Sequence, residues 1–352
     1  MIILAGDIGG TKTWLQIADY SPGSLAKHSP VKDRFTVLFE RRYASAQYAS
    51  FDVLLQEFLQ AAQQDGLPSV EQGCVGVAGP VTDSLTGNDT ANVTNLPWQL
   101  NVQQLAAQHK LHHLYLINDF QAIAFGLEML AADEMMLLQK GDVPANGTIA
   151  PKIVIGAGTG LGQALLVWHG ETNDGHYEVI PSEGGHADFA PGGDEQRELL
   201  SFLAKRQARV SVEDVLSGRG LVNIYHYLAD KYPADVSETL NAAMVNGDAA
   251  AAVGEAGVAA ANSLAGRALD LFVAVYGVQA GNFALTCMAK GGVYIAGGIA
   301  TKIQGFFTRE PFLAAFQNKG SMQRLMRSIP VKLVLNPQVG LKGAALVASR
   351  QQ

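Results

Sequence analysis

Two glycine-rich segments of the chain carry residue types that bind phosphate. The first consists of Gly6, Asp7, Ile8, Gly9, Gly10 and Thr11. The second includes Gly158, Thr159 and Gly160. Glycines let backbone N–H groups crowd around phosphate oxygens, because no Cβ interferes. Thr11 adds a hydroxyl donor, and Asp7 is suited to hold a hydrated Mg²⁺ that neutralises phosphate charge. These residue types therefore favour a phosphate-binding function.

Neither segment fits the common nucleotide-binding motifs. Thr11 stands where the P-loop pattern has its second glycine. In the second segment Leu161 replaces the third glycine of a dinucleotide fingerprint, and a strand is expected after it instead of a helix. Each segment alone is equally well explained as a tight hairpin turn. The presence of two such segments favours loops that hold a phosphate tail from both sides.

A second group of residues is suited to bind hydroxyl groups and to accept a proton. It consists of Asn118, Asp119, Glu183, His186 and Glu213. Phosphoryl transfer needs an acceptor hydroxyl in line with the phosphate and a carboxylate that takes its proton. Each residue also has a structural alternative. Asn118-Asp119 is suited to cap a helix, Glu183 to stabilise a turn, and Glu213 to occupy the first turn of a helix.

Strands are expected on both sides of each glycine segment. Residues 2–4 and 14–18 flank the first segment, and residues 153–155 and 164–168 flank the second. The same strand–glycine–strand plan thus returns about 150 residues later, which predicts two halves built alike.

The other expected elements alternate between strand and helix. Ser50 is a plausible cap for a helix whose apolar face begins at Phe51. Further strands are expected at 73–78, 114–117 and 293–296, and helices at 120–130 and 258–288. This alternation predicts an α/β fold with two sheets and a cleft between them.

Composition and charge exclude several classes of protein. A chain of 352 residues favours two domains, and a net charge of −7 without a basic run argues against nucleic acid. Cys74 and Cys287 are too few for a disulfide framework or a zinc motif and favour a reducing compartment. The N-terminus lacks the pattern of a signal peptide, and the apolar stretch at 271–287 is read as a buried core helix. We therefore expect a cytoplasmic protein without a membrane partner.

The chain resembles the bacterial-type glucokinase family of the actin/hexokinase/Hsp70 ATPase superfamily. The resemblance spans nearly the whole chain in the family's order. Its segments are GDIGGT (6–11), INDF (117–120), GAGTGLG (156–162), EGGHADFAP (183–191), VEDVLSGRGLVNIY (212–225) and GGVYIAGGI (291–299). Lys12 departs from the family's usual Asn and is typical of the repressor–ORF–kinase sugar kinases. That second family also has a Cys-rich zinc motif, which two cysteines cannot supply.

The resemblance implies a role for each candidate residue. Asp119 matches the catalytic base, and Asn118, Glu183, His186 and Glu213 match residues that contact glucose hydroxyls. Asn95 is a further candidate for a sugar contact. The ATP-binding residues would be the two glycine segments together with Gly297 and Gly298.

The resemblance further implies a two-domain actin-like ATPase (ribonuclease H-like) fold with duplicated mixed sheets. We expect residues 1–125, completed by a C-terminal helix at 338–352, to form the smaller domain, and residues 126–337 the larger. The implied reaction is ATP- and Mg²⁺-dependent phosphorylation of D-glucose to glucose 6-phosphate, at the entry to glycolysis, by a homodimer. The residues leave open mannose or fructose as acceptor, ADP or polyphosphate as donor, and a monomer. A non-catalytic sugar sensor and a chaperone-like ATPase are the rival functions.

Overall fold

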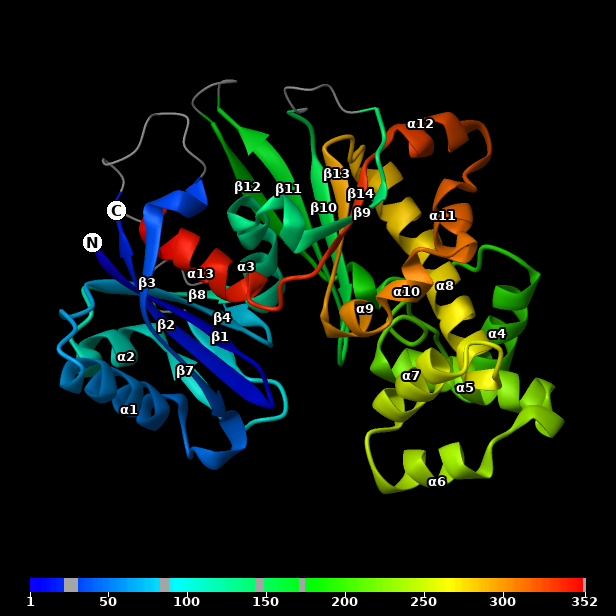
Figure 1. Ribbon diagram of the computed structural model, residues 1–352, viewed down its shortest axis with the longest axis horizontal. Coiled ribbons are helices and arrows are strands. Elements are labelled where there is room, and N and C mark those ends of the chain that lie inside the picture. Colours follow the sequence, from blue (N-terminus) through cyan, green and yellow to red (C-terminus); the bar gives the residue numbers. More distant parts are fainter. Residues whose placement is uncertain (22–30, 83–88, 143–148, 171–174, 351–352) are drawn as a thin grey trace. The chain divides into compact units, whose positions relative to one another are not determined.

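The computed structural model describes residues 1–21, 31–82, 89–142, 149–170 and 175–350. The chain divides into two compact units (Figure 1). Unit 1 comprises Met1–Ala132 and Asn336–Gln352, and unit 2 comprises Asp133–Leu335.

Unit 1 is built on a five-stranded sheet in the order β3-β2-β1-β4-β8. Its strands are β1 (Ile2–Ile8), β2 (Lys12–Tyr20), β3 (Phe35–Ala44), β4 (Gln72–Val77) and β8 (His113–Asn118). Its helices are α1 (Phe51–Gln64), α2 (Val102–His109), α3 (Asp119–Gly126) and α13 (Val339–Arg350). A small sheet contains β5 (Val81–Thr82), β6 (Thr90–Asn92) and β7 (Gln99–Asn101).

Side chains of β1 alternate between the two faces of this sheet, as the period of a strand requires. Leu4 and Ile8 belong to the core that includes α1 and α2, whereas Ile3 and Ala5 pack with the apolar side of α13. Figure 1 shows α1 and α2 on one side of the sheet and α13 on the other. The C-terminal helix is therefore an integral layer of unit 1.

Two glycines allow α13 to lie directly against α3. A Cβ on Gly126 would stand 1.9 Å from the Val339 carbonyl oxygen, and a Cβ on Gly343 would stand 1.8 Å from that of Ala122. Any other residue at either position would force the helices apart. Since Asp119 is the first residue of α3, this contact helps to fix the predicted catalytic carboxylate.

Unit 2 is built on a six-stranded sheet in the order β12-β11-β10-β13-β14-β9. Its strands are β9 (Met135–Gln139), β10 (Lys152–Ala157), β11 (Leu161–His169), β12 (His176–Ser182), β13 (Gly292–Ala296) and β14 (Val331–Val334). Its helices are α4 (Asp194–Ala204), α5 (Gly218–Lys231), α6 (Glu238–Asn246), α7 (Ala249–Ala259), α8 (Leu264–Cys287), α9 (Gly298–Lys302), α10 (Gln304–Phe307), α11 (Glu310–Gln317) and α12 (Gln323–Ser328).

The two sheets confirm the predicted internal duplication. In unit 1, β1 pairs antiparallel with β2 and parallel with β4, and β4 pairs parallel with β8. In unit 2, β10 pairs antiparallel with β11 and parallel with β13, and β13 pairs parallel with β14. Each glycine segment forms the first hairpin turn of its sheet.

The helix expected at 258–288 is confirmed from Leu264 to Cys287, where the structure has α8, but its expected start is wrong. The structure has two helices, because α7 ends at Ala259 and α8 begins at Leu264, with Ser263 capping it. A Cβ on Gly266 would stand 2.1 Å from the Ala261 carbonyl oxygen, so the chain folds closely back on itself here.

Within the described residues, α8 is the one helix long and apolar enough to cross a membrane by length and composition. The structure confirms it as a core helix, because 67% of its most apolar window is buried and it packs against α5, α7 and α11.

Candidate active site

The first glycine turn, Gly9 to Lys12, is fixed from two sides within unit 1. The Gly9 amide donates to the Lys12 carbonyl at 2.9 Å, and the Ser45 hydroxyl donates to the Gly9 carbonyl at 2.9 Å. A Cβ on Gly10 would stand 2.8 Å from the Thr94 carbonyl oxygen. Neither Gly9 nor Gly10 has a φ in the left-handed region, so close approach, and not turn type, requires glycine at position 10.

Asn95 lies beside this turn, because a Cβ added to Gly10 would stand 3.4 Å from the Cβ of Asn95. Its φ of 63° places it in the left-handed region, which Asn tolerates better than most residues. The structure thus brings the sugar candidate Asn95 to the glycine turn. Gly6, Asp7 and Ile8 belong to strand β1 itself, and the turn begins only at Gly9.

Asp7 and Asp119 are close enough to influence each other's charge. Asp7 lies in register with Gly76 of β4, and a Cβ on Gly76 would be 3.8 Å from the Asp119 Cα. The absence of a side chain at Gly76 leaves space between the two acids. Burial, and then the negative charge of Asp119, raises the pKa of Asp7 to about 7. Such a pair is suited to attract a cation or to share a proton.

Asn118 caps helix α3. Its Oδ1 accepts from the Phe120 amide at 2.9 Å, its Nδ2 donates to the Gly79 carbonyl at 3.2 Å, and its backbone amide donates to Gln121 Oε1 at 3.0 Å. Asp119, the next residue, accepts from the same Phe120 amide at 2.9 Å. The N-cap interpretation is therefore correct for Asn118, and the cap fixes the backbone that carries Asp119.

The second glycine turn, Gly158 to Gly160, is supported by Glu213 within unit 2. The Leu161 amide donates to Glu213 Oε2 at 2.9 Å, and a Cβ on Gly160 would stand 2.7 Å from that oxygen. The expectation that Glu213 opens a helix is wrong, because α5 begins at Gly218 behind the cap Ser217. Glu213 instead lies in the turn before α5, where its carboxylate can reach the glycine turn.

Glu183 and His186 belong to one 3₁₀ turn, Gly184–His186 with Glu183 as its N-cap. Their side chains are largely exposed, and Glu183 Oε2 lies 3.8 Å from His186 Nε2. The Gly185 carbonyl accepts from the Glu213 amide at 2.9 Å. The structure therefore brings all three predicted sugar ligands of unit 2 together beside the glycine turn.

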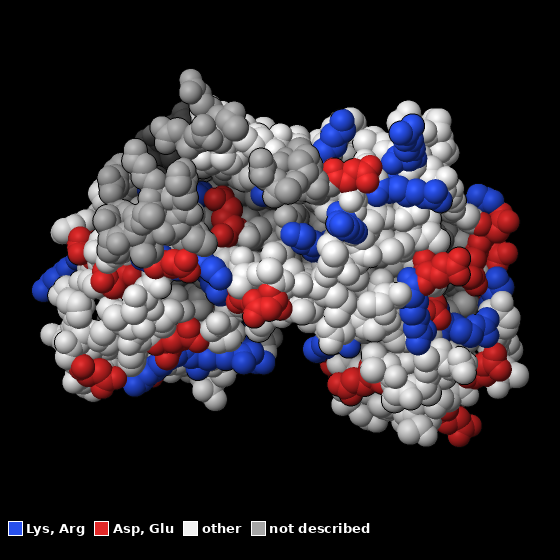
Figure 2. Space-filling model, turned by 45° about the horizontal axis from the view of Figure 1, so that its top comes forward, with Lys and Arg blue, Asp and Glu red and all other residues white. Residues whose placement is uncertain are grey.

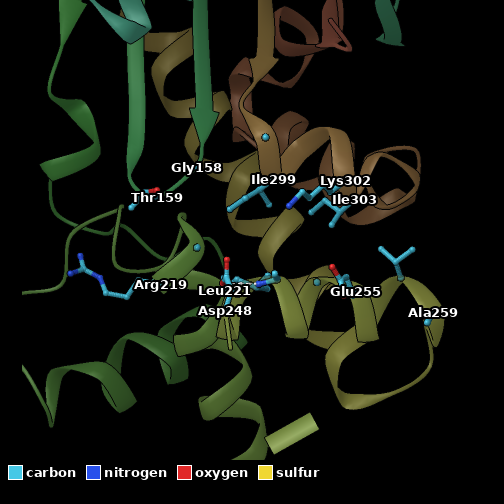
Figure 3. A pocket seen from close by; sticks show the side chains of 16 residues that line it. Gly158, Thr159, Arg219, Leu221, Asp248, Glu255, Ala259, Ile299, Lys302 and Ile303 are labelled. Atoms are coloured by element: carbon cyan, nitrogen blue, oxygen red, sulfur yellow. Dashed lines mark hydrogen bonds between the residues drawn. The ribbon is translucent and has the colours of Figure 1, made fainter. Parts of the chain in front are cut away.

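A cavity of about 830 Å³ opens next to this turn in unit 2 (Figure 3). Gly298, the first residue of α9, lines the cavity. Gly297, which connects β13 to α9, has a φ of 90°. The cavity is lined by Gly158, Thr159, Gly218, Arg219, Leu221, Asp248, Ala250, Ala251, Gly254, Glu255, Val258, Ala259, Gly298, Ile299, Lys302 and Ile303. Its volume suits a nucleoside, and its small and apolar residues suit a flat base.

Sequence reasoning missed the wall of this cavity that α7 provides. Asp248, which caps α7, and Glu255, which belongs to α7, point into the cavity in Figure 3, opposite Ile299. The available signal was the run of Ala and Gly in α7, which leaves room beside a helix. The helix expected at 258–288 begins only where this run ends, so no element was expected on it from the sequence.

No group of three or more His, Cys, Asp or Glu residues in the described part of the chain could hold a metal ion. Asp7 and Asp119 offer two carboxylates, which would leave most positions around a metal ion to water or phosphate. A zinc motif near Glu183 is likewise absent from the described residues.

Comparison with known proteins places these features in a family. The family profile described as "Glucokinase" matches residues 4–351. The chain belongs to the glucokinase family. The glucokinases of Trichormus variabilis and Synechocystis sp. are each 40% identical to it over 99% of the chain and 99% and 98% of their own lengths. The crystal structure of a glucokinase from an Antarctic psychrotroph is 26% identical, covers 99% of both chains and superposes with a TM-score of 0.80.

Membership of the glucokinase family confirms that the chain is a phosphotransferase with a hydroxyl acceptor. The structural match confirms the actin-like ATPase fold with duplicated mixed sheets. Kinase and ATP-binding functions follow from the same membership. The relatives that match nearly the full length of the chain are named glucokinases. This argues against the two rival functions, a non-catalytic sugar sensor and a chaperone-like ATPase.

Proposed function

We propose that this protein transfers the γ-phosphoryl group of ATP to the 6-hydroxyl of D-glucose and thereby supplies glycolysis with glucose 6-phosphate. The observation that carries the proposal is the family match from residue 4 to residue 351, which includes both glycine turns and the carboxylates beside them. The carboxylates are Asp119 and Asp7 in unit 1 and Glu213 next to the turn of unit 2. Carboxylates of this kind can accept a proton, bind a hydrated cation or bind hydroxyl groups, as this reaction requires.

Asp119 is the proposed catalytic base. It stands at the carboxyl end of the parallel strand β8, and the Asn118 cap and the α13 contact hold its helix. A carboxylate in this position can accept the proton of the attacking hydroxyl as the phosphoryl group is transferred. Asn118 and Asn95 are proposed to contact sugar hydroxyls from the same unit.

Asp7 is the proposed partner of Mg²⁺, through water. A bound Mg²⁺ supplies positive charge that offsets the charge of the phosphates during transfer. The raised pKa of Asp7 fits this role. Burial and the charge of Asp119 disfavour the ionised carboxylate, and a nearby cation would stabilise it.

Unit 2 is proposed to hold the nucleotide and much of the sugar. The cavity between α7 and α9 would take the adenosine, and Gly158, Thr159 and Gly160 would approach its phosphates. Glu183, His186 and Glu213 are proposed to bind glucose hydroxyls, since carboxylates accept from hydroxyls and imidazole can donate or accept. Glu213 Oε2 accepts from the Leu161 amide, and Glu213 Oε1, which lies 3.5 Å from Arg219 Nη2, would accept from a sugar hydroxyl.

A coupled assay tests the proposed function. Purified protein is mixed with glucose, mannose or fructose and with ATP, ADP or polyphosphate, each with and without Mg²⁺, and hexose 6-phosphate is measured. We expect glucose with ATP and Mg²⁺ to give the highest kcat/KM. ADP release that does not depend on a sugar, or a faster reaction with another sugar, would overturn the assignment.

The assembly and location are also proposals. Strand β3 is an edge of its sheet and exposes Val37 and Leu38, which supports a homodimer that light scattering can measure. Cys74 and Cys287 are free thiols, which supports the cytoplasm. On the face drawn in Figure 2, acidic and basic side chains are interspersed among uncharged residues, which supports a function without nucleic acid.

A further inference from the structure

Arg219 lies where helix α5 meets the second glycine turn. It belongs to the first turn of α5, and the amide of its neighbour Gly218 donates to the Gly158 carbonyl at 2.8 Å. Arg219 also lines the 830 Å³ cavity together with Gly158 and Thr159. Figure 3 shows Arg219 on the Thr159 side of the cavity, whereas Lys302 lies beside Ile299 and Ile303.

The glycine turn has a negative charge directly behind it. Glu213 is 20% exposed, and its Oε2 accepts from the Leu161 amide at 2.9 Å. The net charge of the cavity wall is zero, because Arg219 and Lys302 are balanced by Asp248 and Glu255. A nucleoside triphosphate would therefore meet Glu213 without an excess of positive charge in the wall. The triphosphate and the Glu213 carboxylate carry like charges and would repel each other.

Arg219 offsets this charge. Its Nη2 lies 3.5 Å from Glu213 Oε1 and 2.9 Å from Asp214 Oδ1, so one guanidinium faces two carboxylates. Burial acts to raise the pKa of Asp214, but hydrogen bonds from Ser211 and the charge of Arg219 together lower it. Asp214 is thereby kept as an anion that holds the guanidinium next to the turn.

The position of Arg219 runs against the usual preference of a helix. The N-terminus of a helix carries partial positive charge, and a cation in the first turn is locally unfavourable. The side chain is 62% exposed, so burial of its stem does not explain its presence. A cation that is unfavourable for its own helix, at a functional site, indicates that the cation stabilises another interaction there.

We propose that Arg219 binds the phosphate chain of the nucleotide and neutralises Glu213 behind the second glycine turn. The inference rests on the proposed function, since it assumes that adenosine occupies the cavity. The guanidinium has five N–H donors, so it can keep the contact with Asp214 and still donate to phosphate oxygens. Its contribution must then grow with the number of phosphates on the ligand.

Calorimetric titration with adenosine, AMP, ADP and ATP, in the absence of sugar, tests the proposal. Arg219→Met keeps the length of the stem and removes the charge, and Arg219→Lys keeps the charge without the fork. Arg197→Met is the matched control, because Arg197 is 61% exposed, pairs with Asp194 in the first turn of α4 and lies outside the cavity.

We expect Arg219→Met to weaken ATP binding about tenfold, ADP less, and adenosine by less than about twofold. Arg219→Lys should recover part of the loss, Arg197→Met should change none of the four affinities, and added NaCl should shrink the ATP effect. An equal loss for all four ligands, or no loss for ATP, would overturn the role of Arg219. Failure of the wild type to bind any of the four ligands would instead count against the proposed function.

Discussion

At the scale of single residues, Asp119 carries the sharpest prediction. Asp119→Ala should lower kcat by at least roughly 10²-fold, the usual size of lost general-base help, and leave glucose affinity within a few-fold. Its Oδ1 shares the Phe120 amide with the Asn118 cap, so α3 keeps its N-terminal cap without it. Steady-state kinetics and calorimetry on the variant measure both quantities. Near-normal turnover would reduce Asp119 to part of the helix cap.

Asp7 makes the stability of the ligand-free chain depend on pH. Its pKa is raised from 3.8 to about 7 by burial and by Asp119, so the folded chain holds this proton more tightly than the unfolded chain. Ionisation of Asp7 therefore costs stability: the cost is small near pH 4, grows as the pH rises and is complete above about pH 7. Asp7→Asn should remove that cost.

Urea unfolding at several pH values measures this effect. We expect Asp7→Asn to be more stable than the wild type by up to about 4 kcal/mol at pH 8, with the difference shrinking toward pH 4. Asp65→Asn, at the exposed end of α1, serves as the control. A difference between Asp7→Asn and the wild type that stays constant with pH would contradict the raised pKa.

At the scale of elements, a substitution in the second glycine turn can test phosphate binding without disturbing the fold. A Cβ on Gly158 meets no atom within 4 Å, although Gly158 lines the cavity. Gly158→Val should therefore fold normally and raise KM for ATP about tenfold or more, with KM for glucose little changed. Gly305→Val in α10 is the control, because its Cβ also meets nothing within 4 Å and it lies outside the cavity. An unchanged KM for ATP in a folded Gly158→Val protein would remove the turn from the phosphate site.

The contact between α3 and α13 gives a second prediction for elements. Gly343→Ala would gain up to about 1 kcal/mol in helix propensity, but its Cβ would stand 1.8 Å from the Ala122 carbonyl oxygen. The overlap should dominate, with a net loss of about 2 kcal/mol in the free energy of unfolding and a lower kcat as α3 shifts. Gly305→Ala, compared in the same urea titration, should stay within about 0.5 kcal/mol of the wild type. A stabilised Gly343→Ala protein would show that the helices can separate at little cost.

At the scale of the whole molecule, the two units should respond differently to each substrate. Adenosine should slow amide hydrogen exchange in α7 and α9, which line the cavity of unit 2, and leave unit 1 unchanged. Glucose should slow exchange around Asn118 in unit 1 and around Glu183 in unit 2, because its predicted ligands come from both. Exchange measured by mass spectrometry distinguishes these patterns. Protection by glucose in unit 2 alone would exclude Asn118 and Asp119 from the sugar site.

The sequence by itself determined the elements whose signals are local. Apolar runs that end in glycine predicted the β1–β2 and β10–β11 hairpins, and the Ser50 cap with its apolar face predicted α1. These features depend on neighbours within a few residues, so the pattern along the chain contains them. The family and its reaction were likewise recognisable from short segments that occur in one order.

Only the tertiary structure decided which distant residues meet. Glu213 lies more than fifty residues from the turn that it supports, and Gly343 touches a carbonyl more than two hundred residues away. The break between α7 and α8 also escaped the sequence, because Ala and Gly suit a continuous helix until the chain folds back on itself. Contacts of this kind depend on packing between elements, and helix or strand propensity does not record them.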